Sequence, residues 1–238
     1  VYFGAGIEQT KIDPGNGMPL AYNDYIANFG DSPTSVPLTV GWGRDTRDSA
    51  LVPSTGRLQR VNGELGIAGD TRYAKANYQF QQYIPLNKKF TLAFNAEAGW
   101  GEGLSGKPFP LFKNFYGGGL GSVRGFEQGT LGGKSSIVGG TTMANIGGTR
   151  KMVLNTEVIA PFPGAGNDRT LRLYGFFDIG NIYAEGEEVD FANLRASTGI
   201  GISWISPIGP LRIAYARPVR KQDDDKTQSI QFQIGTSF

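Results

Sequence analysis

Apolar and polar residues alternate over long stretches of this 238-residue chain, and the alternation constrains the fold more than any other feature. Near the C-terminus, Ile230, Phe232 and Ile234 fall on one face of an extended chain, and Gln231 and Gln233 fall on the other. A period of two is that of a β-strand, whereas an amphipathic helix repeats every 3.6 residues. The chain is therefore predicted to be all-β.

The alternating stretches predict ten strands, most of them about 10 to 14 residues long, with ends placed to within about 2–4 residues. Strands of soluble sheets usually have about five or six residues, whereas a tilted strand that crosses a membrane needs about 9–11. The predicted strands cover residues 2–12, 36–47, 56–68, 72–84, 89–101, 150–162, 170–184, 194–206, 209–218 and 228–238.

One face of these strands is apolar and the other is polar, which is typical of an antiparallel transmembrane β-barrel with its apolar face toward lipid. No stretch approaches the roughly 18 apolar residues of a membrane-spanning helix. A soluble sandwich or a lipocalin-like barrel also alternates, and strand length favours the membrane wall over these alternatives. The expected lipid-facing residues are Leu92, Phe94, Leu173, Phe177, Ile200, Ile202, Leu211, Ile213, Phe232 and Ile234.

The composition argues against an enzyme and against a nucleic-acid-binding protein. The chain has no cysteine and no histidine, so it lacks thiol chemistry and the commonest general base and metal ligand. The net charge is +2, with acids and bases mixed along the chain. Residues 223–225 are three aspartates that could hold Ca²⁺, but the flanking basic residues favour a solvated loop. We therefore expect no enzyme, no cofactor, no metal site and no nucleic-acid partner.

A loop at about 102–149 is far longer than the usual connection, and loops of that length are commonly functional. Ten of the 24 residues at 117–140 are glycine, and among them stands one arginine, Arg124. The loop carries the motif Val123, Arg124, Gly125 and Phe126.

At this motif, "VRGF", the sequence resembles the BamA family, the central β-barrel assembly proteins of Gram-negative outer membranes, and looks most like its neisserial-type members. Further segments resemble the family's strands in the same order. They are "GRLQRVNGELGIAG", "KANYQFQQYIPL", "NTEVIAPFP", "GFFDIGNIY", "GPLRIAYARP" and the terminal "FQIGTSF".

The resemblance implies a sixteen-stranded barrel in the cell outer membrane, preceded by periplasmic POTRA domains. The ten predicted strands then correspond to the last ten of the sixteen. Residues 1–238 are expected to be the C-terminal part of the barrel domain, with the sixth loop at about 102–149 and no POTRA domain. Alternation is already present at Val1, so we expect the chain to be part of a longer protein.

The resemblance also implies a fixed place for Arg124. In the family the sixth loop folds back into the barrel, and its arginine pairs with acidic residues on the inner wall, which here are Glu157 and Asp178. The alternation agrees, because Glu157 falls on the face opposite Leu154 and Val158.

The family folds and inserts other outer-membrane proteins without chemistry, through a weak lateral seam between its first and last strands. Gly235 stands where the family has a glycine that bends the last strand, and Phe238 ends a pattern like the C-terminal signal of barrel proteins. The partners implied are nascent outer-membrane proteins, accessory assembly lipoproteins and the lipid bilayer. Two alternatives stay open, a two-partner secretion pore of the same superfamily and a passive porin.

Overall fold

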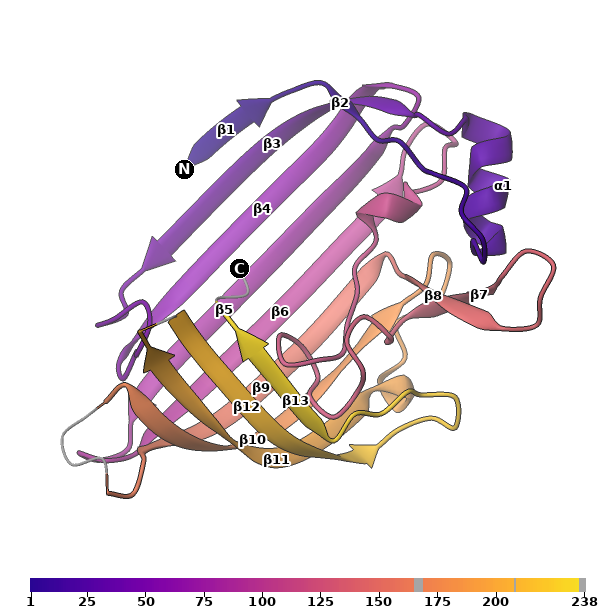
Figure 1. Cartoon of the computed structure of the whole chain (residues 1–238). Helices are drawn as coiled ribbons and strands as arrows, with labels where there is room; N and C mark the ends of the chain where they lie inside the picture. Colours follow the sequence, from indigo (N-terminus) through magenta and orange to yellow (C-terminus); the bar gives the residue numbers. More distant parts are fainter. Residues whose placement is uncertain (165–168, 208, 236–238) are drawn as a thin grey trace.

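A computed structural model describes residues 1–164, 169–207 and 209–235 of the chain. Within these residues, eleven strands form one antiparallel sheet in the order β1, β3, β4, β5, β6, β9, β10, β11, β12 and β13, with β2 also paired to β3. The sheet curves into an open wall, with β1 at one edge and β13 at the other (Figure 1). The all-β antiparallel prediction is confirmed.

Eight of the described strands, β3 to β6 and β9 to β12, have the length that the alternation predicts, and the other described strands are shorter. The strand bounds are β1 Tyr2–Ala5, β2 Glu8–Gln9, β3 Thr34–Asp45, β4 Gly56–Gly69, β5 Tyr73–Pro85, β6 Thr91–Gly103, β7 Gly133–Ser136, β8 Met143–Gly147, β9 Arg150–Pro161, β10 Leu171–Tyr183, β11 Arg195–Ser206, β12 Gly209–Arg220 and β13 Ile230–Ile234. The described residues also contain one α-helix, α1 Leu20–Phe29, and two 3₁₀ turns, η1 Leu111–Lys113 and η2 Phe191–Asn193.

The first predicted strand, 2–12, is wrong as one uninterrupted strand. Gly6 and Ile7 separate β1 from β2, and both pieces pair with β3. The last predicted strand, 228–238, begins at Ile230 and ends at Ile234, and its final three residues lie outside the described ones.

Two of the connections between the predicted strands contain structure of their own. The connection before β3 holds α1, which starts after Pro19 and ends at Gly30, whose φ of 83° ends the helix. The long loop holds the hairpin of β7 and β8. None of the helices described is long and apolar enough to cross a membrane.

The two faces of the sheet differ as expected. Seven of the ten predicted lipid-facing side chains are exposed and the other three, Leu92, Phe94 and Leu211, are partly covered. The opposite, concave face carries the polar side chains of β9, β10, β12 and β13. The outward face is therefore the apolar one, as a wall surrounded by lipid requires.

One buried hydrophobic cluster lies between the long loop and this concave face. Phe115, Val123, Phe126 and Leu131 of the loop form a buried cluster with Val153 of β9 and Ile182 of β10. The part of the loop at residues 115–131 therefore lies over the inner side of the sheet (Figure 1).

Candidate functional site

The tip of the long loop is buried although it is rich in glycine. Val123 and Phe126 are fully buried and Arg124 is 1% exposed. Val123 packs where Gly180 of β10 leaves room, since a Cβ built at Gly180 would lie 3.1 Å from a Val123 methyl group. Packing of this kind offsets part of the entropy lost on ordering a glycine-rich loop.

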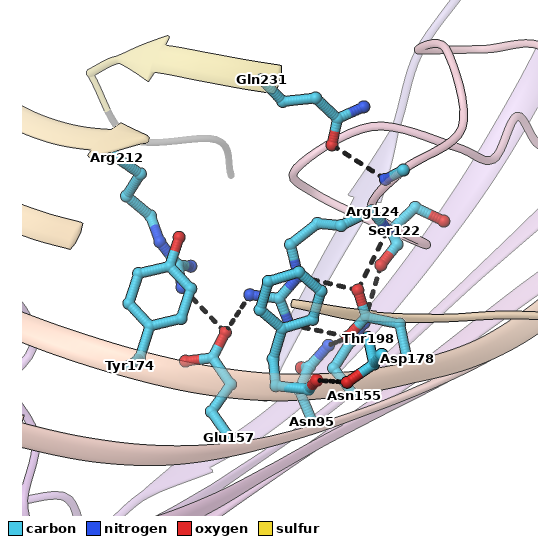
Figure 2. A network of polar contacts seen from close by, with 12 residues as sticks. Asn95, Ser122, Arg124, Asn155, Glu157, Tyr174, Asp178, Thr198, Arg212 and Gln231 are labelled. Carbon is cyan, nitrogen blue, oxygen red and sulfur yellow. Dashed lines mark hydrogen bonds and ion pairs between the residues drawn. The ribbon is translucent and has the colours of Figure 1, made fainter. Parts of the chain in front are cut away.

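The guanidinium of Arg124 lies between carboxylates of two neighbouring strands (Figure 2). Its Nε and Nη2 donate to the two carboxylate oxygens of Asp178 on β10, at 2.7 and 2.6 Å. Its Nη1 donates to Oε1 of Glu157 on β9 at 2.5 Å, and its backbone N–H donates to Asp178 at 3.0 Å. The structure thus brings together the three residues that the sequence singled out.

These charges are removed from solvent to different degrees. The side chains of Arg124 and Asp178 are 2% and 0% exposed, whereas that of Glu157 is 15% exposed. A buried charge is costly unless it is paired and hydrogen-bonded, and the planar fork of arginine pairs with a carboxylate through two parallel bonds. Asp178 is therefore the principal partner of Arg124.

Aromatic rings of β10 cover the same guanidinium. Its central carbon lies 3.7 Å from the centre of the Phe176 ring and 5.5 Å from that of Tyr174. Tyr174, Phe176 and Asp178 fall on one face because side chains alternate along a strand. The face of an aromatic ring attracts a cation, so the rings add to the binding of Arg124.

A second arginine, Arg212 of β12, shares Glu157 with Arg124. Its Nη2 donates to Glu157 Oε1 at 2.8 Å, and its guanidinium lies 4.8 Å from the Tyr174 ring. Two arginines thus face two carboxylates, which leaves this cluster without net charge. Arg212 stands between Leu211 and Ile213, which were expected to face lipid, so alternation puts it on the polar face, but no signal in the sequence assigned it to the cluster.

Two asparagines extend the network along the inner wall (Figure 2). Asn155 of β9 donates to the backbone carbonyl of Ser122 in the loop at 2.7 Å, and it accepts from Asn95 of β6 at 3.0 Å. The loop is therefore fastened to β9 by its backbone as well as by its arginine.

The loop also contacts the last strand. Gln231 of β13 accepts from the backbone N–H of Gly125 at 3.2 Å and donates to the carbonyl of Phe126 at 2.7 Å. The sequence pattern placed Gln231 on the polar face, but no local signal tied it to a loop about 105 residues earlier.

Gly125 and Gly235 both have backbone conformations that favour glycine. Gly125 has φ of +86° and passes close to β12, where an added Cβ would lie 3.3 Å from that of Ala216. Gly235 has φ of +90° at the end of β13, with open space around it. Most side chains are strained at such angles, so the strand turns where a glycine permits it. Phe238 lies outside the described residues.

The aspartates at 223–225 are not all solvated, which corrects the prediction from the sequence. The side chain of Asp225 is 1% exposed and forms an ion pair at 2.9 Å with Arg195 of β11. Within the described part of the chain, no group of three or more acidic residues is arranged to hold a metal ion. Asp225 instead fastens the connection between β12 and β13.

Comparison with known proteins finds similarity over the whole chain. The model of the Omp85 superfamily domain matches residues 1–238. The outer membrane protein assembly factor BamA of Neisseria meningitidis serogroup B is 38% identical over 272 aligned residues, which cover 100% of this chain and 34% of that protein. The sorting and assembly machinery component 50 homolog of Bos taurus is 33% identical, over 82% of this chain and 44% of that protein.

A solved structure supports the fold. BamA from Haemophilus ducreyi, in a form lacking POTRA domains 1–3, superposes with a TM-score of 0.82 over 97% of this chain and 53% of that one, at 22% sequence identity. The chain spans about a third to just under half the length of the curated relatives compared here. Their names describe assembly components and not enzymes.

Proposed function

The chain belongs to the Omp85 superfamily and forms part of an outer-membrane β-barrel, and we propose a function from this premise. We propose that the protein that contains this chain folds other β-barrel proteins and inserts them into the outer membrane. We infer that its partners are nascent outer-membrane proteins, accessory assembly lipoproteins and the bilayer. Residues 1–238 would supply the C-terminal part of the barrel, including the sixth loop.

The observation that supports the proposal is the position of the long loop, which is bound to the inner face of the sheet. Arg124 ties the loop to β9 and β10 through Glu157 and Asp178. The same loop reaches Gln231 on β13, the strand at the edge of the described sheet. A loop so placed can control how the edge of the last strand is presented.

An edge strand offers unpaired backbone groups to an incoming strand, and strand addition needs no nucleophile or metal. In the described residues β13 pairs only with β12. We infer that a client strand pairs at the seam beside β13, and that Gly235 weakens the end of this strand so that the seam can open. In this proposal Phe238 belongs to the C-terminal recognition signal.

The test is reconstitution of the full-length protein into lipid vesicles with an unfolded β-barrel client. Insertion is measured as the fraction of client that becomes folded and protease-resistant. We expect insertion to be faster than in empty vesicles, and slower with Arg124→Ala than with the unaltered protein. No acceleration by the full-length protein, together with export of a soluble substrate or steady ion conductance, would favour the secretion pore or the porin instead.

A further inference from the structure

The last described strand is weakly held by the sheet alone. β13 has five residues and pairs with β12 through five residue pairs, from Tyr215–Ile230 to Leu211–Ile234. Its apolar side chains point outward, and Ile230, Phe232 and Ile234 are all more than 60% exposed. A strand of this length with one paired edge exchanges and frays readily, so other contacts matter to its position.

The loop supplies such contacts just before the strand begins. Phe126 and Thr227 form an antiparallel bridge. On either side of it, the N–H of Glu127 donates to the carbonyl of Lys226 at 3.0 Å, and the N–H of Gln228 donates to that of Gly125 at 2.9 Å. The motif is thus paired by its backbone with the residues that lead into β13.

Gln231 adds the contact within the strand itself. Its side chain lies on the concave face, and the residue is only 4% exposed. Its amide accepts from Gly125 N–H and donates to the Phe126 carbonyl (Figure 2 shows the first of these). Only a side chain with both an acceptor and a donor at this length can satisfy both backbone groups.

The loop residues that bind Gln231 come directly after Arg124 in the chain. Gly125 follows Arg124 in the chain, and Arg124 is bound to Glu157 of β9 and Asp178 of β10. A connection therefore runs through the loop from β9 and β10 to β13. This connection is separate from the backbone pairing through β11 and β12, the strands that lie between β10 and β13 in the sheet.

We propose that Gln231 is a positioning residue that fastens the last strand to the loop, so that the Arg124 ion pairs set the position of β13 as well as that of the loop. The significance for client insertion rests on the proposed function. The mechanical link itself does not, because it can be measured without any client.

The test measures amide hydrogen exchange of residues 230–234 in the full-length protein in a bilayer. Gln231→Leu is expected to speed this exchange by roughly tenfold, because two hydrogen bonds to the loop are lost. Gln231→Glu keeps the acceptor but places a buried carboxylate against the Phe126 carbonyl, so it should speed exchange at least as much as Gln231→Leu does. The control is Gln233→Leu, on the same face of the same strand, where the described structure records no hydrogen bond to the loop.

Two further variants test whether the Arg124 ion pairs and Gln231 belong to the same connection. Arg124→Ala should also speed exchange in β13, and the effect should not add to that of Gln231→Leu, because both break one connection. A disulfide formed by Glu127→Cys with Lys226→Cys should restore slow exchange to Gln231→Leu, and residues 1–238 contain no cysteine of their own.

Unchanged exchange in Gln231→Leu, or the same change in Gln233→Leu, would show that β12 alone positions β13 and would overturn the proposal. Release of the loop by Arg124→Ala without any effect on β13 would do the same. Faster exchange with unaltered client insertion would leave the link standing and count against the proposed function.

Discussion

Arg124 and Asp178 are joined by three hydrogen bonds, two from the guanidinium and one from the backbone N–H of the arginine. The two residues are 54 positions apart, and both side chains are almost fully buried. A loop with many glycines is thus tied at one side chain to the middle of a strand. We therefore expect the stability of this contact to decide whether the loop stays on the inner face of the wall.

Replacing the arginine tests that contact. Arg124→Ala leaves Asp178 buried without its partner, and breaking a buried pair costs about 3–5 kcal/mol. Arg124→Lys should recover only part of this free energy, because an ammonium cannot form the planar fork. Proteolysis and hydrogen exchange of residues 118–132 in the full-length protein would report the release. Equal protection in the unaltered protein and in Arg124→Ala would show that the loop is held by packing alone.

The two carboxylates should differ in importance. Asp178 is fully buried and accepts three hydrogen bonds from Arg124, whereas Glu157 accepts one and is shared with Arg212. Asp178→Asn is therefore expected to release the loop more than Glu157→Gln. Loop exchange in the two isosteric variants, compared at one pH, measures this. A larger effect of Glu157→Gln would mean that the charge of Glu157, balancing two arginines, dominates.

Gly125 should matter for its contact with β12 as well as for its backbone angle. An alanine Cβ there would lie 3.3 Å from Ala216 and 3.4 Å from Pro218, whereas Gly129, with φ of +73°, has nothing within 4 Å. Both Gly125→Ala and Gly129→Ala carry backbone strain of about 1–2 kcal/mol. Only the first should also push the loop away from β12. Equal losses in thermal stability and loop protection would rule out the packing contribution.

Gly235 is expected to act at the seam. Valine cannot adopt φ of +90° without strain, so Gly235→Val should extend the strand end and strengthen its pairing. Client insertion should slow while the stability of the barrel is kept or raised. Gly235→Asn is the matched control, since asparagine tolerates positive φ better than valine does. Insertion at the normal rate with a straightened strand would reject a role of this glycine in opening the seam.

The features that depend only on the alternation of side chains along a strand were predictable from the sequence. Strict alternation placed Glu157, Asp178 and Arg212 on the concave face, because the period of a strand leaves no choice once one face is apolar. The resemblance added which of these acids meets Arg124. The predicted strands also agree with the structure to within a few residues over most of the wall.

The features that were missed depend on contacts distant in sequence. Gln231 looks like any polar residue of a strand, and its partners are backbone groups of a loop. Asp225 sits in a charged run that looks solvated, yet Arg195 buries it. The helix at 20–29 lies in a stretch with no strand pattern, and it packs Tyr25 against Phe112 of the long loop.

The most direct measurement is a double-mutant cycle between Arg124 and Asp178 in the full-length protein. Loop opening free energies come from hydrogen exchange of residues 118–132 in the unaltered protein, Arg124→Ala, Asp178→Ala and the double variant, and client insertion is measured on the same four. If the ion pair holds the loop, the two residues should be coupled by about 2–3 kcal/mol, and insertion should fall in each single variant with little further loss in the double. A coupling within about 0.5 kcal/mol of zero, or normal insertion in a protein whose loop is released, would contradict the account.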